Sequence, residues 1–173
     1  MKAPTAYVMI VVAILTALIA LPLAGAGTIT EKGRDVFHYV KVEVIKVGDV
    51  DGHVIGIAEG KGLEFVEGSG DVGNYSMKVM FDYRNGAGRF QGYSMITFGD
   101  GSTLTTQYEG TTTPHPSGVS TWGGTVSLVR GTGRFEGIQG TASFTGKRVA
   151  PLTPGGSADC YTDFVRTYTL PSK

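Results

Sequence analysis

The sequence predicts an all-β protein, with one eight-stranded antiparallel β-barrel over residues 34–171 and a signal peptide before it. The length of 173 residues fits a single domain, and the 27 glycines lack the period of collagen. Between the glycines, valine, threonine, tyrosine and phenylalanine recur in short runs that turn residues separate. Eight such runs follow one another with no convincing helix, and eight antiparallel strands can close a barrel without leaving an edge.

Residues 1–26 have the pattern of a secretory signal peptide. Lys2 supplies the positive charge, Tyr7–Leu23 is a nearly unbroken apolar run, and Ala24-Gly25-Ala26 has the small residues of a cleavage site. We therefore expect cleavage after Ala26, a secreted or periplasmic location, and no stable membrane insertion afterwards. The alternative is an uncleaved anchor, because a run of about 17 apolar residues is the lower limit for crossing a bilayer.

The strands are expected in an order set by turn signals. They cover residues 36–47, 53–66, 75–83, 89–98, 102–112, 122–130, 135–147 and 160–170. The first alternates valines with Lys41 and Glu43, as a half-buried strand does, and the polar stretch 28–35 is expected to be only a lead-in. Glycines in the second strand indicate sharp bends. The third places most of its bulky residues on one face, and Asn85-Gly86 then suits a type I′ hairpin turn.

The second half continues the same way. Asp100-Gly101 is another hairpin signal, and the fifth strand after it is rich in threonine. A loop at 113–121 contains two prolines and leads to the sixth strand. The longest loop, at 149–158, also holds prolines and glycines, and the last strand follows it.

Two segments share the pattern Gly-x-Gly-Arg-Phe-x-Gly, namely Gly86–Gly92 and Gly131–Gly137. Glycines at this spacing suit turns and bends rather than helices. Two copies are too few for a repeat protein, which needs about three or more. We interpret them as equivalent hairpin corners of one closed sheet, and we expect Phe135 to be an apolar plug.

Several functional classes find no support. The 15 basic and 15 acidic residues balance, and no basic stripe indicates a nucleic-acid partner. A single cysteine, Cys160, excludes an intramolecular disulfide, and we interpret it as a core or rim residue. The three histidines lack metal-site spacing, so no metal site is predicted. Gly131-x-Gly133 precedes a strand instead of a helix, which argues against a dinucleotide, and no cofactor is predicted.

The run Gly131–Gly137, with Ile138 and Gly140, resembles the turn and strand start of the allene oxide cyclase and dirigent protein superfamily. Gly101–Leu104 and Tyr161–Leu170 resemble the neighbouring and last strands of these proteins. With its leader, the chain resembles a bacterial-type secreted member. The resemblance implies an eight-stranded barrel with an apolar cavity, often a dimer or trimer. Allene oxide cyclases isomerise a fatty-acid epoxide, and dirigent proteins steer the coupling of phenolic radicals.

Aromatic residues are the main indication of a ligand-binding site, because they occur in every expected strand. Some are expected to line an apolar pocket, with tyrosine hydroxyls as its polar contacts. The alternative is that they simply fill the barrel. The candidate ligand-binding residues are Tyr75, Phe81, Phe98, Trp122, Phe144 and Tyr168.

The candidate catalytic residues are Glu109, Asp163 and Tyr108. Both carboxylates lie in mid-strand among neutral residues. A carboxyl buried in the barrel would have a raised pKa and could transfer protons. The alternative is a solvated position on the outer face.

Two functions remain open. The first is a secreted or periplasmic barrel whose apolar lumen binds a small hydrophobic or phenolic molecule, without catalysis or as a chaperone. The second is a cyclase or isomerase that templates ring closure of a reactive polyketide-, lipid- or phenol-derived substrate, since holding a flexible molecule in one conformation supplies the entropy that cyclisation loses. The expected partners are that small apolar molecule and, for a homodimer or homotrimer, further copies of the chain.

Overall fold

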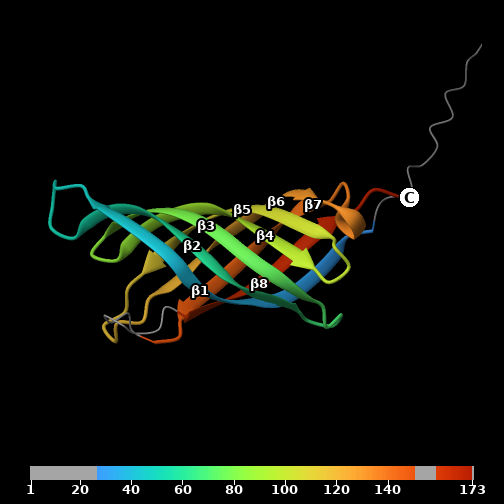
Figure 1. Ribbon diagram of the computed structural model, residues 1–173, viewed down its shortest axis with the longest axis horizontal. Helices are drawn as coiled ribbons and strands as arrows, with labels where there is room; N and C mark the ends of the chain where they lie inside the picture. The colour runs from blue at the N-terminus through green and yellow to red at the C-terminus, as the bar shows by residue number, and fades with distance from the viewer. Residues whose placement is uncertain (1–26, 151–158, 173) are drawn as a thin grey trace, which may run out of the picture.

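The computed structural model describes residues 27–150 and 159–172, so the predicted signal peptide and most of the loop at 149–158 lie outside the described residues. The chain forms a closed barrel in which each strand pairs antiparallel with the next and β8 closes on β1 (Figure 1). The predicted all-β, eight-stranded barrel is thus confirmed. The elements are β1 Ile29–Lys46, β2 His53–Val66, β3 Val72–Arg84, β4 Ala87–Phe98, β5 Thr103–Thr113, β6 Thr121–Gly131, the short 3₁₀ turn η1 Gly133–Phe135, β7 Gln139–Arg148 and β8 Asp159–Thr169.

The first strand begins earlier than the sequence predicts. The stretch expected to be a lead-in belongs to β1, which pairs with β8 from Ile29 to His38. The inward residues of this stretch include Glu31, Gly33 and Asp35. Because none of them is apolar, the alternation that marks a half-buried strand is missing there, although the backbone is fully paired.

The two ends of the barrel differ. The turns after β2 and β4 and the connection η1 lie at one end, and the turns after β1, β3 and β5 lie at the other (Figure 1). A cluster of buried side chains fills the first end, which we call the plugged end. Its members are Val66, Ile96, Phe98, Leu104, Leu128, Phe135, Ile138 and Tyr168. We call the opposite end the mouth.

Phe135 is buried as predicted, and its ring lies 5.3 Å from that of Phe98 and 6.4 Å from that of Tyr168. The two glycine motifs, however, are not equivalent corners. Gly86 belongs to the hairpin turn at the mouth, whereas Gly133 begins η1 at the plugged end. The reason is topological: the two motifs precede an even and an odd strand, and alternate turns of an antiparallel barrel lie at opposite ends.

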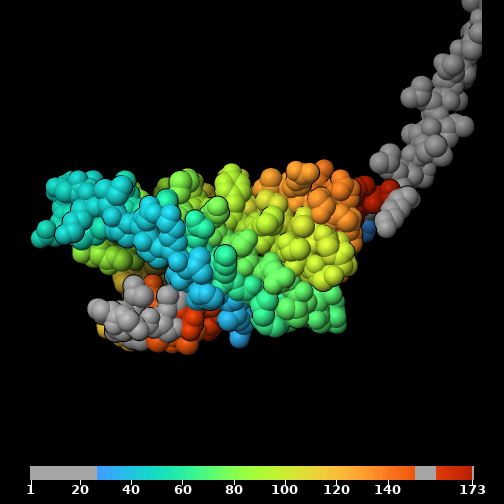
Figure 2. All heavy atoms as spheres, viewed as in Figure 1, coloured from blue at the N-terminus to red at the C-terminus, as the bar shows by residue number. Residues whose placement is uncertain are grey.

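At the mouth, the hairpin of β1 and β2 extends past the other strands, as the cyan segment of Figures 1 and 2 shows. β1 pairs with β2 as far as Lys46, but its pairing with β8 ends at His38. Among the described residues, no helix is long and apolar enough to cross a membrane.

Candidate functional site

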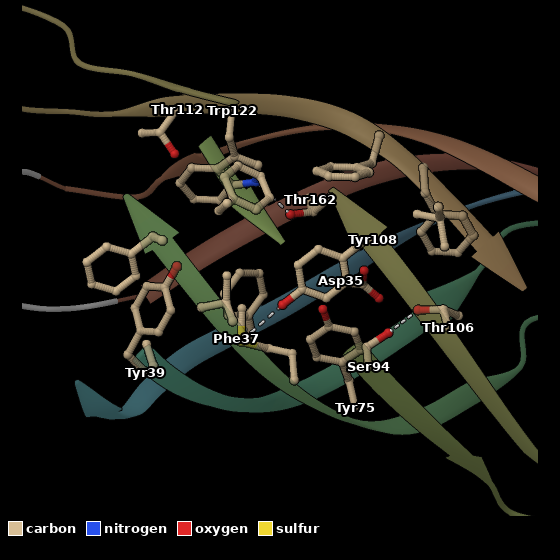
Figure 3. A pocket seen from close by; sticks show the side chains of 18 of the residues that line it. Asp35, Phe37, Tyr39, Tyr75, Ser94, Thr106, Tyr108, Thr112, Trp122 and Thr162 are labelled. Atoms are coloured by element: carbon tan, nitrogen blue, oxygen red, sulfur yellow. Dashed lines mark hydrogen bonds between the residues drawn. The ribbon is translucent and has the colours of Figure 1, made fainter. Parts of the chain in front are cut away.

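The barrel encloses a cavity of about 410 Å³ between the plugged end and the mouth. Its floor is the inner side of the plug, where Ile96, Leu104 and Leu128 line it. At the mouth it is lined by Val44 and Gly86. Residues from all eight strands line this space, and Figure 3 shows side chains such as Phe37, Tyr108 and Trp122 around it. The aromatic residues of the barrel therefore do not fill it completely.

Aromatic rings form most of the cavity wall. The ring of Phe37 lies 5.7 Å from that of Tyr75 and 6.4 Å from that of Trp122. On the other side, the rings of Phe90, Tyr108 and Phe144 lie 6.2 to 6.3 Å from one another. These tilted and edge-on arrangements are the ones that aromatic pairs prefer. A planar apolar molecule would therefore meet both ring faces and ring edges on entering.

The polar edges of the wall are mostly satisfied within the protein. Trp122 Nε1 donates to Thr162 Oγ1 at 3.0 Å, and Tyr108 donates its hydroxyl to the Lys78 carbonyl at 3.1 Å. The hydroxyl groups of Ser94 and Thr106 pair at 2.7 Å. Figure 3 labels both partners of the Trp122–Thr162 and Ser94–Thr106 contacts. Because these polar groups bind one another, they are not available to a ligand, and the cavity surface is largely apolar.

Most of the predicted ligand-binding residues do line the cavity. Tyr75, Phe81, Trp122 and Phe144 do so, and so does the candidate catalytic residue Tyr108. Phe98 and Tyr168 point inward as well, but they belong to the plug beneath the cavity floor. Strand alternation identifies the inward face of each strand, but not how far along the barrel a residue lies.

The two predicted carboxylates, Glu109 and Asp163, lie on the outer face. Tyr108 points inward, so its neighbour Glu109 points outward and is exposed. Asp163 lies between two inward residues and pairs outside the barrel with Arg34, whose Nε donates to Asp163 Oδ1 at 2.6 Å and whose Nη2 donates to Oδ2 at 3.0 Å. A role for either carboxylate inside the cavity does not fit these positions.

The sequence interpretation missed a group of charges inside the barrel. Arg166, on β8, donates from Nε to Glu31 Oε2 and from Nη1 to Glu64 Oε1, both at 2.7 Å. Tyr168 donates its hydroxyl to the other oxygen of Glu31 at 2.9 Å. Glu64 and Arg166 are each only 3% exposed. The three ion-paired side chains are satisfied by one another, and both Glu64 and Arg166 line the cavity.

Asp35 is the exception in this group. It is 8% exposed and lines the cavity, and its Oδ1 has no hydrogen-bond partner in the described part of the chain. Burial raises the pKa of Asp35 well above its ordinary value, repulsion from Glu64 and a side-chain hydrogen bond with it add to the rise, and attraction to Arg166 opposes it. Asp35 therefore favours its uncharged form, in which Glu64 is one partner of the acid and Oδ1 is left to exchange a hydrogen bond with a bound molecule.

Tyr75 is a second neighbour of Asp35 in the cavity wall, beside Glu64. Figure 3 shows its hydroxyl directed to the interior, on the side of Asp35. Burial raises the pKa of Tyr75 well above its ordinary value, and the charge of Asp35 is the next largest cause. A phenol and a carboxylic acid, both uncharged, are thus brought together at one level of the cavity. Such a pair can donate to or accept from an oxygen atom of a bound molecule.

The remaining candidates for chemistry are inert. Cys160 is fully buried, and burial raises the pKa of its thiol to about 11, so it is not a nucleophile at neutral pH. In residues 27–150 and 159–172, no group of three or more histidine, cysteine, aspartate or glutamate side chains is arranged to hold a metal ion.

No protein-family model and no curated protein matches the chain. Among solved structures, it is similar to the pterocarpan synthase dirigent protein GePTS1, at 14% identity and a TM-score of 0.49, over 92% of this chain and 100% of that one. It is also similar to the pterocarpan synthase dirigent protein PsPTS1, at 12% identity and a TM-score of 0.44, over 83% of this chain and 97% of that one. Both are dirigent proteins, one of the two families that the sequence resembles.

Proposed function

We propose that this protein encloses a small, uncharged or mainly apolar molecule of aromatic or aliphatic character inside its barrel, and that it does so outside the cytoplasm. The observation that carries the proposal is a cavity of about 410 Å³ with an aromatic wall and with Asp35 Oδ1, a carboxyl oxygen that has no hydrogen-bond partner among the described residues. Sites for small molecules have this size and this composition, with few polar groups in an apolar lining. The proposed location depends on the leader pattern of residues 1–26.

The charges near the floor favour a neutral group there. Arg166 carries one positive charge and contacts two carboxylates, Glu31 and Glu64. An anion placed beside them would meet a net negative charge in an environment of low polarity, where repulsion is strong. An uncharged oxygen group, such as a hydroxyl, would instead share a hydrogen bond with Oδ1 of the uncharged Asp35 acid.

Binding can be tested with N-phenylnaphthylamine, a neutral probe that fluoresces in apolar surroundings. Val126 and Val129 lie on the same strand, and Val126 lines the cavity whereas Val129 is 53% exposed. Val126→Phe should weaken probe binding at least about tenfold by occupying the cavity, and Val129→Phe should leave it unchanged. Equal affinity in both variants, or no binding by the wild-type protein, would refute the proposal.

A catalytic function is the second candidate, and Asp35 is the observation that favours it. An isomerisation needs no further reactant: the acid would give its proton to an oxygen of the bound molecule and recover one from a carbon when the new double bond or ring forms. A raised pKa suits this exchange, because the acid is protonated before the reaction and its conjugate base is strong enough to accept a proton afterwards.

The two functions are separable by Asp35→Asn. Asparagine keeps the size of the side chain and its hydrogen bonds but cannot transfer a proton. Molecules extracted from the native protein should be identified by mass spectrometry and incubated with the wild-type protein and with this variant. Conversion by the wild-type protein alone supports the enzyme, whereas unchanged molecules with both proteins support a binding protein.

A further inference from the structure

Arg148, at the end of β7, carries the second buried polar atom that has no hydrogen-bond partner among the described residues. Arg148 lines the cavity, and the atom is its Nε, whereas its guanidinium also has a hydrogen bond with Cys160. Its backbone N–H donates to the Ser120 carbonyl at 3.1 Å, which fixes the strand end beside the β5–β6 loop at the mouth. A buried donor that lacks a partner costs free energy, and this cost is recovered when a ligand supplies the acceptor.

The two arginines of the cavity wall also differ in the ion pairs that the described residues form. The other cation of the cavity wall, Arg166, contacts Glu31 and Glu64 at 2.7 Å each. In the described part of the chain, Arg148 forms no ion pair. Burial raises the pKa of Tyr39 and of Tyr83, and the positive charge of Arg148 opposes both rises. Arg148 is thus close to both hydroxyl groups at the mouth, far along the barrel from the carboxylates of the floor.

We propose that the ligand of this cavity is amphipathic, and that Arg148 binds its anionic group, a carboxylate or a sulfonate-like oxyanion, at the mouth. This inference rests on the proposed function, since it names the chemistry of the molecule that the barrel encloses. The apolar part would lie against the aromatic wall, and its far end would reach the uncharged acid of Asp35. A guanidinium suits this task because it stays charged when partly buried and presents several donors in one plane.

The test compares two probes that differ by one charged group. Anilinonaphthalene sulfonate is N-phenylnaphthylamine with an added sulfonate. The wild-type protein should bind the sulfonate at least about tenfold more tightly, because hydrogen bonds to charged groups are the strong ones. Arg148→Gln should remove this preference, measured as the ratio of the two affinities in the same variant. Arg89→Gln, on the exposed face of β4, should keep it.

Three outcomes are distinguishable. If the neutral probe binds but the sulfonate is not preferred, or if Arg148→Gln keeps the preference, the anion site is refuted and the proposed function stands. If neither probe binds, both fail. Arg148→Lys guards against misfolding, since it keeps the charge but lacks the Nε donor, and it should restore part of the preference lost in Arg148→Gln. The single tryptophan, Trp122, reports on the fold of each variant from inside the cavity.

A second inference rests on the edge of β1, independently of any ligand. Beyond His38, β1 has no strand partner on its β8 side in the described part of the chain. The edge that results is apolar: Val40, Val42 and Val44 are 48%, 54% and 52% exposed. An exposed apolar edge of this kind pairs readily with another strand.

We infer that a second copy of the chain covers this edge by antiparallel pairing around a two-fold axis at Val42. In that register, Val40 lies opposite Val44 of the second copy, and Lys41 lies opposite Glu43 of the second copy. The strand is therefore complementary to itself in both charge and apolar character, and the ion pair that Lys41 Nζ and Glu43 Oε1 form within one chain, at 2.8 Å, would be exchanged for pairs between the two copies. Val42 and Val44 also line the cavity, so the second copy would extend the cavity wall at the mouth.

Charge swaps test this register. By sedimentation equilibrium, the wild-type protein should be a dimer. Lys41→Glu should make it dissociate, since glutamates would then oppose each other, and Lys41→Glu with Glu43→Lys should restore the dimer. Lys32→Glu, on the part of β1 that β8 covers, should have no effect. A monomeric or trimeric wild-type protein, or a dimer that survives Lys41→Glu, would overturn the inference.

Discussion

The motif Gly-x-Gly-Arg-Phe-x-Gly occurs twice, and its two copies adopt different structures at opposite ends of the barrel. In Gly86–Gly92, the first glycine is part of a tight turn and the rest of the motif belongs to β4. In Gly131–Gly137, the first glycine ends β6, and the three residues after Thr132 form η1. The phenylalanine of the first copy lines the cavity, whereas that of the second closes the barrel.

Flanking contacts explain the difference. Asn85, just before the first copy, has φ 51°, and Gly86, its first residue, has φ 81°; together they are the left-handed pair of a type I′ turn. In the second copy, Thr132 bonds to Thr103 through its backbone N–H at 3.0 Å and its hydroxyl at 2.7 Å, so this segment is held against β5. The shared glycines permit a reversal of the chain, and the neighbouring residues decide which reversal forms.

The largest expected difference between the copies lies in their phenylalanines. Phe135 is 4% exposed within a packed cluster, so Phe135→Ala should lower the free energy of unfolding by about 3–5 kcal/mol. Phe90 borders the cavity and loses fewer contacts, so Phe90→Ala should cost about half as much. Denaturant titrations measure both. Phe90→Ala should also change the affinity for N-phenylnaphthylamine, and equal costs would contradict the assignment of one end as a plug.

This contrast also shows what the sequence could predict. Turn signals and strand alternation identify all eight strands and the inward face of residues such as Tyr75 and Phe144. They do not reveal how far along the barrel axis a residue lies. Tyr168 was therefore expected to contact the ligand, but it belongs to the plug. The buried charges were missed because register alone brings them together: Glu31 on β1 is paired with Arg166 on the last strand, and Asp35 is paired with Glu64 across the hairpin of β1 and β2. Inward polar residues also break the pattern that marks a strand.

Alanine substitution at the two turn glycines, Gly133 and Gly86, should give the next largest loss of stability. Gly133 has φ 62° and Gly86 has φ 81°, so alanine at either position should cost about 1 kcal/mol in backbone strain. Gly133→Ala should cost roughly 1 kcal/mol more, because its Cβ would collide with Ser102 Oγ, which accepts a hydrogen bond from the Arg134 N–H at 3.0 Å. Thermal unfolding of both variants tests this order, and a neutral Gly133→Ala would refute it.

The motif arginines should differ by less. Arg134 Nη2 lies 2.7 Å from Asp71 Oδ2, and its guanidinium lies 4.6 Å from the Phe98 ring centroid. These contacts are partly exposed, so Arg134→Gln should destabilise the protein by about 1 kcal/mol at most, and less in high salt. Arg89 is exposed on β4, and Arg89→Gln should have no measurable effect. If chemical denaturation gave the same free energy of unfolding for Arg134→Gln and Arg89→Gln, the contacts of Arg134 would not stabilise the second motif.

The smallest effect concerns pH, and it should separate the two ends. At the mouth, His53 Nδ1 lies 2.5 Å from Asp49 Oδ1, and Nε2 lies 2.8 Å from Asp82 Oδ1. Both ring nitrogens can donate hydrogen bonds only when the ring is charged. The two hydrogen bonds therefore raise the pKa of His53, and the bond to Asp82 is the largest cause. Burial and the nearby charge of Arg84 oppose the rise. The stabilisation is complete below the ordinary histidine pKa of about 6.5 and is lost as pH rises through the raised value.

The plugged end titrates in the opposite direction. The Ser102 N–H donates to Asp100 Oδ1 at 2.9 Å and lowers the pKa of Asp100, and this contribution is lost only on acidification. Raising the pH from about 6 to about 9 should therefore loosen the turn at 47–52 and not the turn at 99–102. Hydrogen exchange, corrected for the intrinsic effect of pH, measures each turn. His53→Gln should abolish the response at 47–52, because glutamine does not titrate. If both turns loosen equally, or if the variant responds like the wild-type protein, His53 does not hold the mouth.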